Sequence, residues 1–203
     1  MPQNPDPPRI AAILPAAGAS SRMKGADKLL ELIDGIPLLR RSASALCSDV
    51  ITKTLAVLPK QDAARRKALD GLGLHIIDNP APESGMGGSL ALAMRALPPE
   101  TDAVLIHLAD MPDITSDHVA TLCAAFSPDA PRCILRAASE GRPGHPVLFG
   151  RAHFGDLARL RGDRGARDLI AANREHLRLV PLPGRAALTD LDTPEDWAAY
   201  RAR

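Results

Sequence analysis

The segment Ile10–Lys28, IAAILPAAGASSRMKGADK, decides the fold of this chain. Its first five residues form a continuous apolar run, which is typical of a strand buried on both faces of a parallel sheet. Pro15 ends the run, and a series of small residues follows. Ligands of open α/β sheets bind beyond the carboxyl ends of the strands. The segment therefore predicts a first buried strand that opens into a ligand loop.

Apolar runs and segments of helical composition alternate along the rest of the chain. We expect strands at residues 51–58, 74–77, 103–108, 133–137, 147–149 and 177–181, and helices at residues 61–69, 89–97, 116–126, 163–173 and 194–201. This alternation predicts an α/β fold with a three-layer, Rossmann-like, mostly parallel sheet. Residues 1–8, rich in proline, are expected to form a disordered tail, and residues 9–203 a single domain.

The composition excludes several classes of protein. Only 2% of the 203 residues are aromatic, which argues against binding single-stranded nucleic acid by base stacking. The formal net charge of +1 provides no overall field that would attract a nucleic acid or a membrane surface. The three cysteines include no C-x-x-C pair, and neither a signal core nor a bilayer-spanning run is present. We expect a cytoplasmic protein without a nucleic-acid or membrane partner.

The loop after the first strand has the composition of a phosphate-binding loop. Small side chains allow the backbone to approach an anion, and Arg22 and Lys28 would supply positive charge. The alternative is an ordinary strand-to-helix turn with two solvated basic residues. Three familiar motifs are absent: the spacing of Gly25 and Lys28 is not that of a P-loop, Leu90 interrupts a dinucleotide fingerprint, and no G-x-S-x-G elbow is present.

Three aspartates could hold a metal ion. Asp110 directly follows the apolar run 103–108, at a position where a carboxylate would suit Mg²⁺, although it could also cap the next turn. Asp192 or Thr193 is expected to cap the last helix. Asp190 precedes this cap and is therefore the freer of the two later aspartates to reach a metal.

Other polar residues have two interpretations each. His107 lies inside a predicted strand and is expected to be a hydrogen-bonded core residue, whereas His145 at a loop-to-strand junction could touch a ligand. Arg164 and Arg167 could grip an acceptor phosphate or begin a solvated helix. The basic cluster 65–67 is expected to form a solvated helix face.

Six segments, taken in order, resemble the MobA-like nucleotidyltransferases, and most closely the molybdenum cofactor cytidylyltransferases. Residues 14–28 are similar to the family signature L-A-A-G-x-S-x-R-M-G-x-x-K. The other five segments are GMGGSL (85–90), LADMP (108–112), GHPVLF (144–149), GDRGAR (162–167) and DLDTPED (190–196). The resemblance implies a Rossmann-like fold of the nucleotide-diphospho-sugar transferase type.

The resemblance also implies roles for individual residues. Asp110 would hold Mg²⁺, with Asp190 or Asp192 as a second metal contact, and Lys28, Arg22 and Asp110 would serve the chemistry. The residues expected to bind the nucleotide are Ala16, Ala17, Gly18, Ser20, Arg22, Lys28, Gly85, Met86, Gly87 and Ser89. One departure is Lys24, which stands where the family usually has glycine, with a glycine displaced to Gly25.

The resemblance further implies a reaction. Ala17 matches the A-A-G of the cytidylyltransferases, whereas the guanylyltransferases resemble L-A-G-G at this point. We expect transfer of CMP from CTP to the phosphate of molybdenum-loaded molybdopterin, with release of pyrophosphate, and a molybdoenzyme or its chaperone as a further partner. The alternatives are GTP as the donor, another phosphorylated small molecule as the acceptor, or a non-catalytic carrier of the molybdopterin cofactor.

Overall fold

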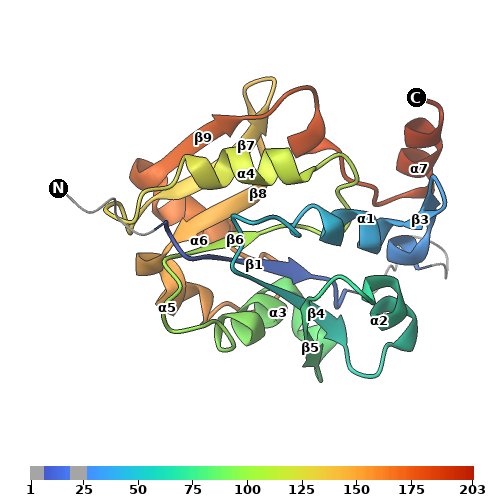
Figure 1. The fold of residues 1–203 in the computed structure, drawn as a ribbon, viewed down its shortest axis with the longest axis horizontal. Coiled ribbons are helices and arrows are strands. Elements are labelled where there is room, and N and C mark those ends of the chain that lie inside the picture. The colour runs from blue at the N-terminus through green and yellow to red at the C-terminus, as the bar shows by residue number, and fades with distance from the viewer. Residues whose placement is uncertain (1–6, 19–26) are drawn as a thin grey trace.

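The computed structural model describes residues 7–18 and 27–203 of the chain. Within this part, seven strands form one sheet in the order β5-β4-β1-β6-β8-β7-β9 (Figure 1). The strands are β1 (Ile10–Pro15), β4 (Lys53–Pro59), β5 (His75–Asn79), β6 (Ala103–Ile106), β7 (Ile134–Ser139), β8 (Arg142–Gly150) and β9 (Leu177–Pro181). Among these described strands, β8 alone runs antiparallel to its neighbours, β6 and β7. The predicted mostly parallel sheet is confirmed.

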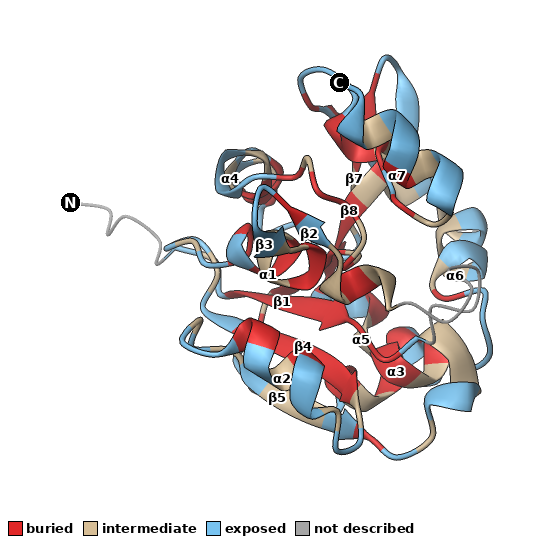
Figure 2. Ribbon diagram, turned by 90° about the vertical axis from the view of Figure 1, so that its right-hand side faces the viewer, coloured by how far each residue is buried: buried red, intermediate tan, exposed pale blue. Residues whose placement is uncertain are grey.

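Helices cover both faces of this sheet and complete the three layers (Figure 1). One face carries α1 (Leu38–Ser44), α2 (Ala63–Leu69), α4 (Ser116–Ala124) and α7 (Pro194–Arg201), and the other carries α3 (Gly85–Met94), α5 (Phe154–Leu157) and α6 (Arg167–Ala172). Figure 2 shows β1 and β4 buried between helices whose outer surfaces are exposed. Residues Ile10, Ala12 and Leu14 of β1 pack into one core cluster and Ile13 into the other, as strand alternation requires.

The first strand lies at the centre of the parallel part of the sheet. All six residues of β1 are buried, and β1 pairs in parallel with β4 on one side and with β6 on the other. A strand covered on both edges and both faces needs apolar side chains throughout, which explains the unbroken apolar run. The carboxyl ends of β1 and β6 consequently lie next to each other.

A small hairpin and the helix after it are not among the predicted elements. Strands β2 (Leu32–Ile33) and β3 (Ile36–Pro37) pair antiparallel around Asp34 and Gly35, whose φ angles are 53° and 78°. Positive φ at both central residues is the signature of a type I′ turn, for which Asp-Gly is a preferred pair. The dipeptide Asp34-Gly35 is therefore a sequence signal that predicts this hairpin.

Several predicted boundaries were wrong for local reasons. Helix α3 begins at Gly85 rather than Ser89, so the glycines predicted to form a loop lie in its first turn. Helix α6 begins at Arg167 rather than at residue 163, because Gly162 and Gly165 have φ angles of 69° and 56°. Helix α4 begins at Ser116 as predicted, after the capping hydroxyl of Thr115, which accepts from the backbone N–H of His118, but it ends at Ala124 rather than at residue 126.

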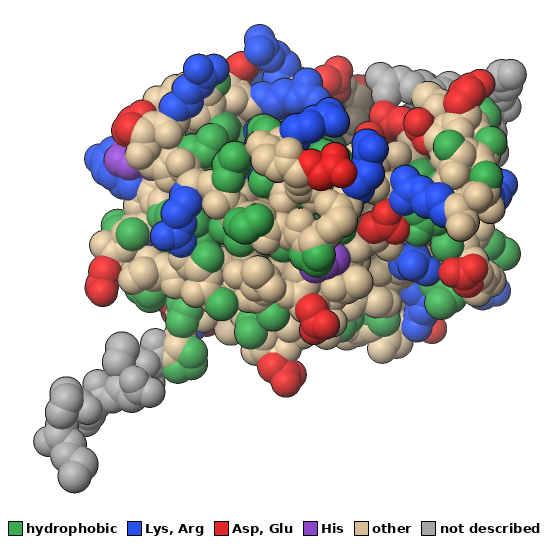
Figure 3. Space-filling view, turned by 90° about the horizontal axis from the view of Figure 1, so that it is seen from above, with side chains coloured by type: hydrophobic (Ala, Val, Ile, Leu, Met, Phe, Trp, Pro, Cys, Tyr) green, Lys and Arg blue, Asp and Glu red, His purple; other side chains and the backbone are tan. Residues whose placement is uncertain are grey.

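The last helix agrees with its prediction, since Thr193 caps α7 and Pro194 is its first residue. In the described residues no helix is long and apolar enough to cross a membrane. On the face drawn in Figure 3, basic and acidic side chains are interspersed, in keeping with the net charge of +1. Residues 1–6 of the predicted tail lie outside the described residues.

Candidate active site

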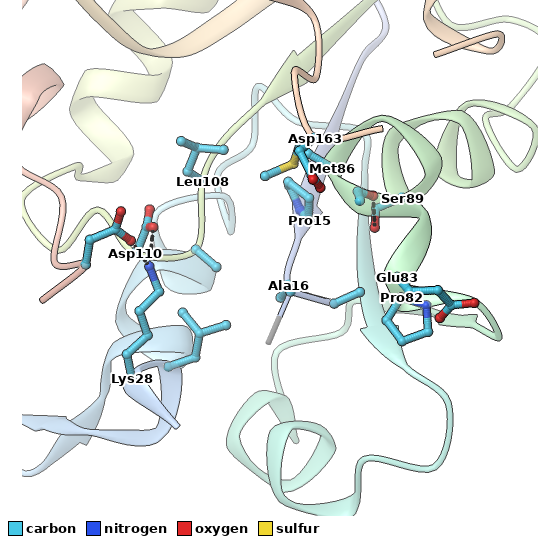
Figure 4. A pocket seen from close by; sticks show the side chains of 16 residues that line it. Pro15, Ala16, Lys28, Pro82, Glu83, Met86, Ser89, Leu108, Asp110 and Asp163 are labelled. Atoms are coloured by element: carbon cyan, nitrogen blue, oxygen red, sulfur yellow. Dashed lines mark hydrogen bonds and ion pairs between the residues drawn. The ribbon is translucent and has the colours of Figure 1, made fainter. Parts of the chain in front are cut away.

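A cavity of about 490 Å³ lies at the carboxyl ends of β1 and β6, where ligands of such sheets bind. Segments distant in the sequence line it, namely the residues after β1, the turn at Lys28, the start of α3 and the residues after β6, together with Asp163 before α6 and Asp192 before α7 (Figure 4). Its lining residues include Ala16, Ala17, Gly18, Lys28, Glu83, Gly85, Met86, Ser89, Leu108, Asp110, Asp163 and Asp192. Most of the predicted nucleotide and metal residues are thus brought together.

The segment after β1 forms one wall of this cavity. Ala16 and Ala17 are buried, whereas Gly18 is exposed and a Cβ atom added to it would meet no atom within 4 Å. The predicted contacts Ser20 and Arg22, and the unusual Lys24, lie outside the described residues.

Lys28 joins two of the predicted metal ligands. Its Nζ atom lies 2.7 Å from Oδ2 of Asp110, and it also contacts Oδ1 of Asp192 (Figure 4). Burial of the ammonium group lowers its pKa, but the charges and hydrogen bonds of the two carboxylates outweigh this effect and raise the pKa of Lys28 above its ordinary value. Lys28 therefore carries its positive charge at neutral pH.

Asp192 reaches this position because its segment is attached to the end of β6. The backbone N–H of Leu191 donates to the carbonyl oxygen of Asp110 at 3.0 Å. This bond holds residues 190–192 beside Asp110, and the cap at Thr193 then starts α7. The structure thus brings Asp192, rather than Asp190, to the ammonium group of Lys28, which also contacts Asp110.

Asp190 lines a neighbouring cavity, but its carboxyl group still interacts electrostatically with Asp110 and Asp192. Partial withdrawal of its carboxyl from water raises the pKa of Asp190, and the negative charges of Asp110 and Asp192 raise it further. The residue as a whole remains exposed. Mutual repulsion of three nearby carboxylates favours the binding of positive charge.

Asp110 also has the property expected of a metal ligand. Its Oδ1 atom is buried and has no hydrogen-bond partner among the described residues. Leaving a carboxylate oxygen unpaired in a buried position is unfavourable unless a cation or a donor binds there. The described residues hold no cluster of three or more His, Cys, Asp or Glu side chains that could bind a metal by themselves. The donor set therefore fits Mg²⁺ held by one or two carboxylates together with substrate phosphates.

The start of α3 forms the wall opposite Lys28. Gly85, Met86 and Ser89 line the cavity, and the Ser89 hydroxyl accepts from Nδ2 of Asn79 at 3.2 Å. Gly87 does not line it, because its backbone N–H donates to the carbonyl oxygen of Gly162 at 2.7 Å. A Cβ on Gly87 would lie 2.7 Å from backbone atoms of Arg161. The glycine at position 87 is therefore required for close packing of α3 against the loop before α6.

A second cavity of about 320 Å³ adjoins the first, and the two share Met86, Leu108 and Asp163. The predicted acceptor residues His145, Arg164 and Arg167 all line it, as does Asp190. The remaining wall is mainly apolar, with side chains from α3, β6, β8 and α6: Leu90, Ile106, Val147, Phe149 and Ile170. This arrangement suits a ligand with an uncharged body and an anionic group.

Arg136 is a further basic residue of this cavity that is absent from the predicted set. It lies on β7, and its Nε donates to the carbonyl oxygen of Gly144 at 2.8 Å. Burial lowers the pKa of Arg136, and the positive charge of Arg167 lowers it further. Its position inside a predicted strand, where it interrupts apolar residues, is the signal that could have identified it.

Two buried histidines lie near these arginines. Burial lowers the pKa of His107 to about 3, with a contribution from His145, and neither of its ring nitrogens has a partner among residues 7–18 and 27–203. The prediction that His107 lies in the core was right, but the predicted hydrogen bond is absent in that part of the chain. Burial, and then the charges of Arg136 and Arg167, lower the pKa of His145 to about 4. Both rings are therefore neutral at pH 7.

The family model of the MobA-like NTP transferase domain matches residues 12–178. The chain therefore belongs to this family of nucleotidyltransferases, as its six motifs predicted.

Three curated relatives show the range of functions in such proteins. The 2-C-methyl-D-erythritol 4-phosphate cytidylyltransferase of Streptomyces avermitilis is 32% identical over 140 residues, which are 64% of this chain and 55% of that protein. Purine catabolism protein PucB of Bacillus subtilis is 27% identical over 209 residues, 96% of this chain and 97% of that protein. A molybdenum cofactor guanylyltransferase of Cereibacter sphaeroides is 29% identical over 192 residues, 94% of each chain. The chain thus spans little more than half of the Streptomyces enzyme.

Solved structures confirm the type of fold. Rv0371c from Mycobacterium tuberculosis is similar with a TM-score of 0.82 and 23% identity, covering 97% of this chain and 100% of that one. CMP:2-keto-3-deoxy-manno-octonic acid synthetase in complex with CTP is similar with a TM-score of 0.74 and 16% identity, covering 96% and 97%. The sheet and its helices are those of the nucleotide-diphospho-sugar transferase type.

Proposed function

We propose that this protein transfers CMP from CTP to the phosphate of molybdenum-loaded molybdopterin, with Mg²⁺ as cofactor and pyrophosphate as the second product. The observation that carries the proposal is the pair of adjoining cavities. The first contains Lys28 between Asp110 and Asp192, and the second contains basic side chains beside an apolar wall. A donor and an acceptor bound in these cavities would meet at the residues shared by both.

The reaction needs an in-line attack of an acceptor phosphate oxygen on the α-phosphorus of the nucleotide. A new P–O bond forms, the bond to the β-phosphate oxygen breaks, and the electron pair leaves with pyrophosphate. A phosphate monoester is largely ionised at neutral pH, so this step does not depend on a general base. This is consistent with a first cavity that offers aspartates and a lysine, and with the lowered pKa of His145 in the second cavity, about 4, which makes that imidazole a weak base.

The residues of the first cavity would bind and orient the triphosphate. The backbone at Ala17 and Gly18 would approach its oxygens, and Lys28 would stabilise the charge that develops on the leaving pyrophosphate. Asp110 would hold Mg²⁺ through its unpartnered Oδ1, with Asp192 beside it. When bound, Mg²⁺ neutralises charge on the phosphate groups during the transfer.

The acceptor would bind in the second cavity. The guanidinium groups of Arg136, Arg164 and Arg167 offer donors for an anionic group, and the side chains of Leu90 and Phe149 face an uncharged body. A phosphorylated heterocycle such as molybdopterin has both features. Several curated relatives are named molybdenum cofactor guanylyltransferases, and this supports a molybdopterin acceptor.

Support for CTP comes from Ala17. Ala17 is a lining residue of the first cavity, although it is almost fully buried. The sequence Ala16-Ala17-Gly18 matches the A-A-G of the cytidylyltransferases, whereas the guanylyltransferases resemble L-A-G-G at this point. Streptomyces relatives named cytidylyltransferases agree with this choice, whereas the guanylyltransferases favour GTP.

Thermal unfolding with CTP, GTP, ATP and UTP, each with and without Mg²⁺, tests the donor. A nucleotide at about a hundred times its dissociation constant should stabilise the protein by roughly 2.7 kcal/mol. We expect the largest Mg²⁺-dependent increase in melting temperature with CTP. A larger increase with GTP would assign the protein to guanylyl transfer, and no increase with any nucleotide would contradict a transferase and favour a cofactor carrier.

Product formation tests the acceptor. The protein is incubated with molybdenum-loaded molybdopterin and CTP labelled at the α-phosphate, and the label is followed by chromatography. We expect it in molybdopterin cytosine dinucleotide, with one pyrophosphate released per transfer. Transfer to another phosphorylated small molecule, such as a sugar-alcohol phosphate, but not to molybdopterin would retain the nucleotidyl transfer and overturn the acceptor.

A further inference from the structure

Arg65 of α2 is buried, contrary to the prediction of a solvated basic face. Only 4% of the residue is exposed, although its neighbours Arg66 and Lys67 reach solvent. Its guanidinium group contacts the main-chain carbonyl oxygens of Ala16 and Gly18, which line the first cavity, and the carboxylate of Asp27. A buried guanidinium group is unfavourable unless its donors and its charge are both satisfied. The groups that Arg65 contacts therefore satisfy its donors and its charge, and Arg65 in turn restrains those groups.

The guanidinium group binds both residues that flank the segment 19–26. On one side, Nη2 donates to the carbonyl oxygen of Gly18 at 3.0 Å. On the other side, Nε and Nη2 donate to the two carboxylate oxygens of Asp27 at 2.8 and 3.0 Å. This second contact is a bidentate arginine–carboxylate pair, which fixes direction as well as distance.

A third contact orients the peptide group before Ala17. Nη1 of Arg65 donates to the carbonyl oxygen of Ala16 at 2.6 Å. In a trans peptide the C=O and the following N–H point in opposite directions. The contact therefore turns the N–H of Ala17 away from Arg65. Ala16, Ala17 and Gly18 all line the first cavity, whereas Arg65 lies outside its lining.

The same arginine also contacts Asp27, the residue that caps the turn carrying Lys28. Oδ1 of Asp27 accepts from the backbone N–H of Leu29 at 3.1 Å and so caps the short turn that carries Lys28. Arg65 holds that capping carboxylate by both of its oxygens. The turn that carries Lys28 is thus connected to α2 through the ion pair between Asp27 and Arg65.

We propose that Arg65 is a positioning residue for the triphosphate of the nucleotide. It fixes the peptide groups at 16–18 and the turn at Lys28 in the arrangement that accepts phosphate oxygens, without touching the nucleotide itself. This inference rests on the proposed nucleotidyl transfer. A merely structural arginine would contribute to stability and leave the affinity of the folded protein for phosphate unchanged.

Isothermal titration of wild type, Arg65→Lys and Arg65→Met with Mg²⁺–CTP and with inorganic triphosphate tests the proposal. Lysine retains the charge but cannot bridge Ala16, Gly18 and Asp27 at once. We expect both dissociation constants to rise by about 10- to 100-fold in Arg65→Lys, the effect of losing hydrogen bonds to charged groups. The rise should be similar for the two ligands, because only phosphate contacts are affected.

Arg66→Met is the matched control. Arg66 lies on the same helix, and its ion pair with Asp78 is at the surface. This variant should bind both ligands as the wild type does. Asp27→Asn provides a second perturbation of the bidentate pair, so the proposal is still tested if Arg65→Met does not fold. Circular dichroism and urea unfolding establish that the titrated variants are folded.

The outcomes distinguish a failure of the positioning role of Arg65 from a failure of the proposed nucleotidyl transfer. If the wild type binds both ligands and folded Arg65→Lys and Asp27→Asn bind them equally well, the role of Arg65 is overturned and the proposed function stands. If the wild type binds neither Mg²⁺–CTP nor triphosphate, the proposed function fails and the role of Arg65 fails with it.

Discussion

The ammonium group of Lys28 lies 2.7 Å from Oδ2 of Asp110, and the second oxygen of the same carboxylate is buried without a partner among the described residues. One carboxylate thus has one oxygen paired with a cation and one oxygen with no partner in the described part of the chain. Under the proposed function, the first oxygen would position Lys28 and the second would hold Mg²⁺. Replacing Lys28 and replacing Asp110 should therefore have different effects.

Replacing Lys28 by alanine should nearly abolish nucleotidyl transfer. Removal of one charged donor at a developing negative charge reduces kcat by about 10²- to 10³-fold in other enzymes. We expect a loss of this size in steady-state assays of pyrophosphate release. Lys53→Ala is a suitable control, because Lys53 is exposed at the first residue of β4, at the other end of that strand from the cavity. An unchanged rate in Lys28→Ala would remove this lysine from the mechanism.

Replacing Asp110 by asparagine should change the dependence on Mg²⁺ more than the affinity for nucleotide without metal. The amide retains the size of the side chain but loses its negative charge, which is the property that a hard cation requires. Thermal unfolding with CTP over a series of Mg²⁺ concentrations should show a midpoint at least about tenfold higher. Asp129→Asn, at an exposed loop position, is the control. The same midpoint in Asp110→Asn and wild type would contradict the metal role.

Replacing Ala17 by glycine should move the preference from CTP towards GTP. The change introduces, at a lining residue of the first cavity, the glycine that the guanylyltransferases resemble at this point. It should also lower the free energy of unfolding by roughly 1 to 2 kcal/mol, through lost burial and greater backbone freedom of the unfolded chain. The measurement is the ratio of kcat/KM for the two nucleotides. A ratio equal to that of the wild type would show that base choice lies elsewhere.

The buried histidines predict a loss of stability in mild acid. In the folded protein the pKa of His107 is lowered to about 3 and that of His145 to about 4, whereas both would be near 6.5 in the unfolded chain. Below pH 6.5 the unfolded state therefore binds more protons than the folded state, and stability decreases as the pH falls. Each histidine contributes a slope of about 1.4 kcal/mol per pH unit between these pKa values.

His107→Leu isolates one half of this effect. It removes the imidazole whose two nitrogens lack partners in the described part of the chain, so stability at pH 7 should be retained or increased. The slope of unfolding free energy against pH below about pH 6 should fall by roughly 1.4 kcal/mol per unit. His75→Gln, at an exposed histidine, is the control. An unaltered slope in His107→Leu would show that this ring does not titrate as described.

The central strands could be predicted because a strand buried on both faces requires a continuous run of apolar residues in the sequence. The apolar runs at 10–14 and 103–106 lie in β1 and β6, and the acidic and small residues after them lie at the cavity. The start of α3 could not be predicted in the same way. Glycines at 85, 87 and 88 suggest a loop by their backbone freedom, whereas their lack of a side chain is used for packing against Ser84 and residues 161–163.

Contacts between side chains of distant segments were harder to predict than the positions of strands and helices along the chain. The basic run at 65–67 suggests solvent exposure, yet Arg65 shares the spacing of the buried residues Ala68 and Leu69 and so lies on their face of the helix. The choice between Asp190 and Asp192 depended on capping, but the bond from Leu191 to Asp110 decides which carboxylate reaches Lys28. Such contacts join segments distant in the chain, and local patterns do not contain them.

The reversed direction of β8 has a consequence for how this protein could acquire new acceptors. Because β8 runs antiparallel to β6 and β7, its first residues, including Gly144 and His145, lie at the edge of the sheet where β6 and β7 end. Within the sheet, the strands from β5 to β6 are joined to β8, β7 and β9 through the β6–β8 pairing. Under the proposed function, changes in the turn at 140–141 or in β8 would alter the second cavity, to which β8 contributes, whereas the described lining of the first cavity comes from other segments. One continuous sheet would then allow the acceptor cavity to change while most of the nucleotide cavity stays the same.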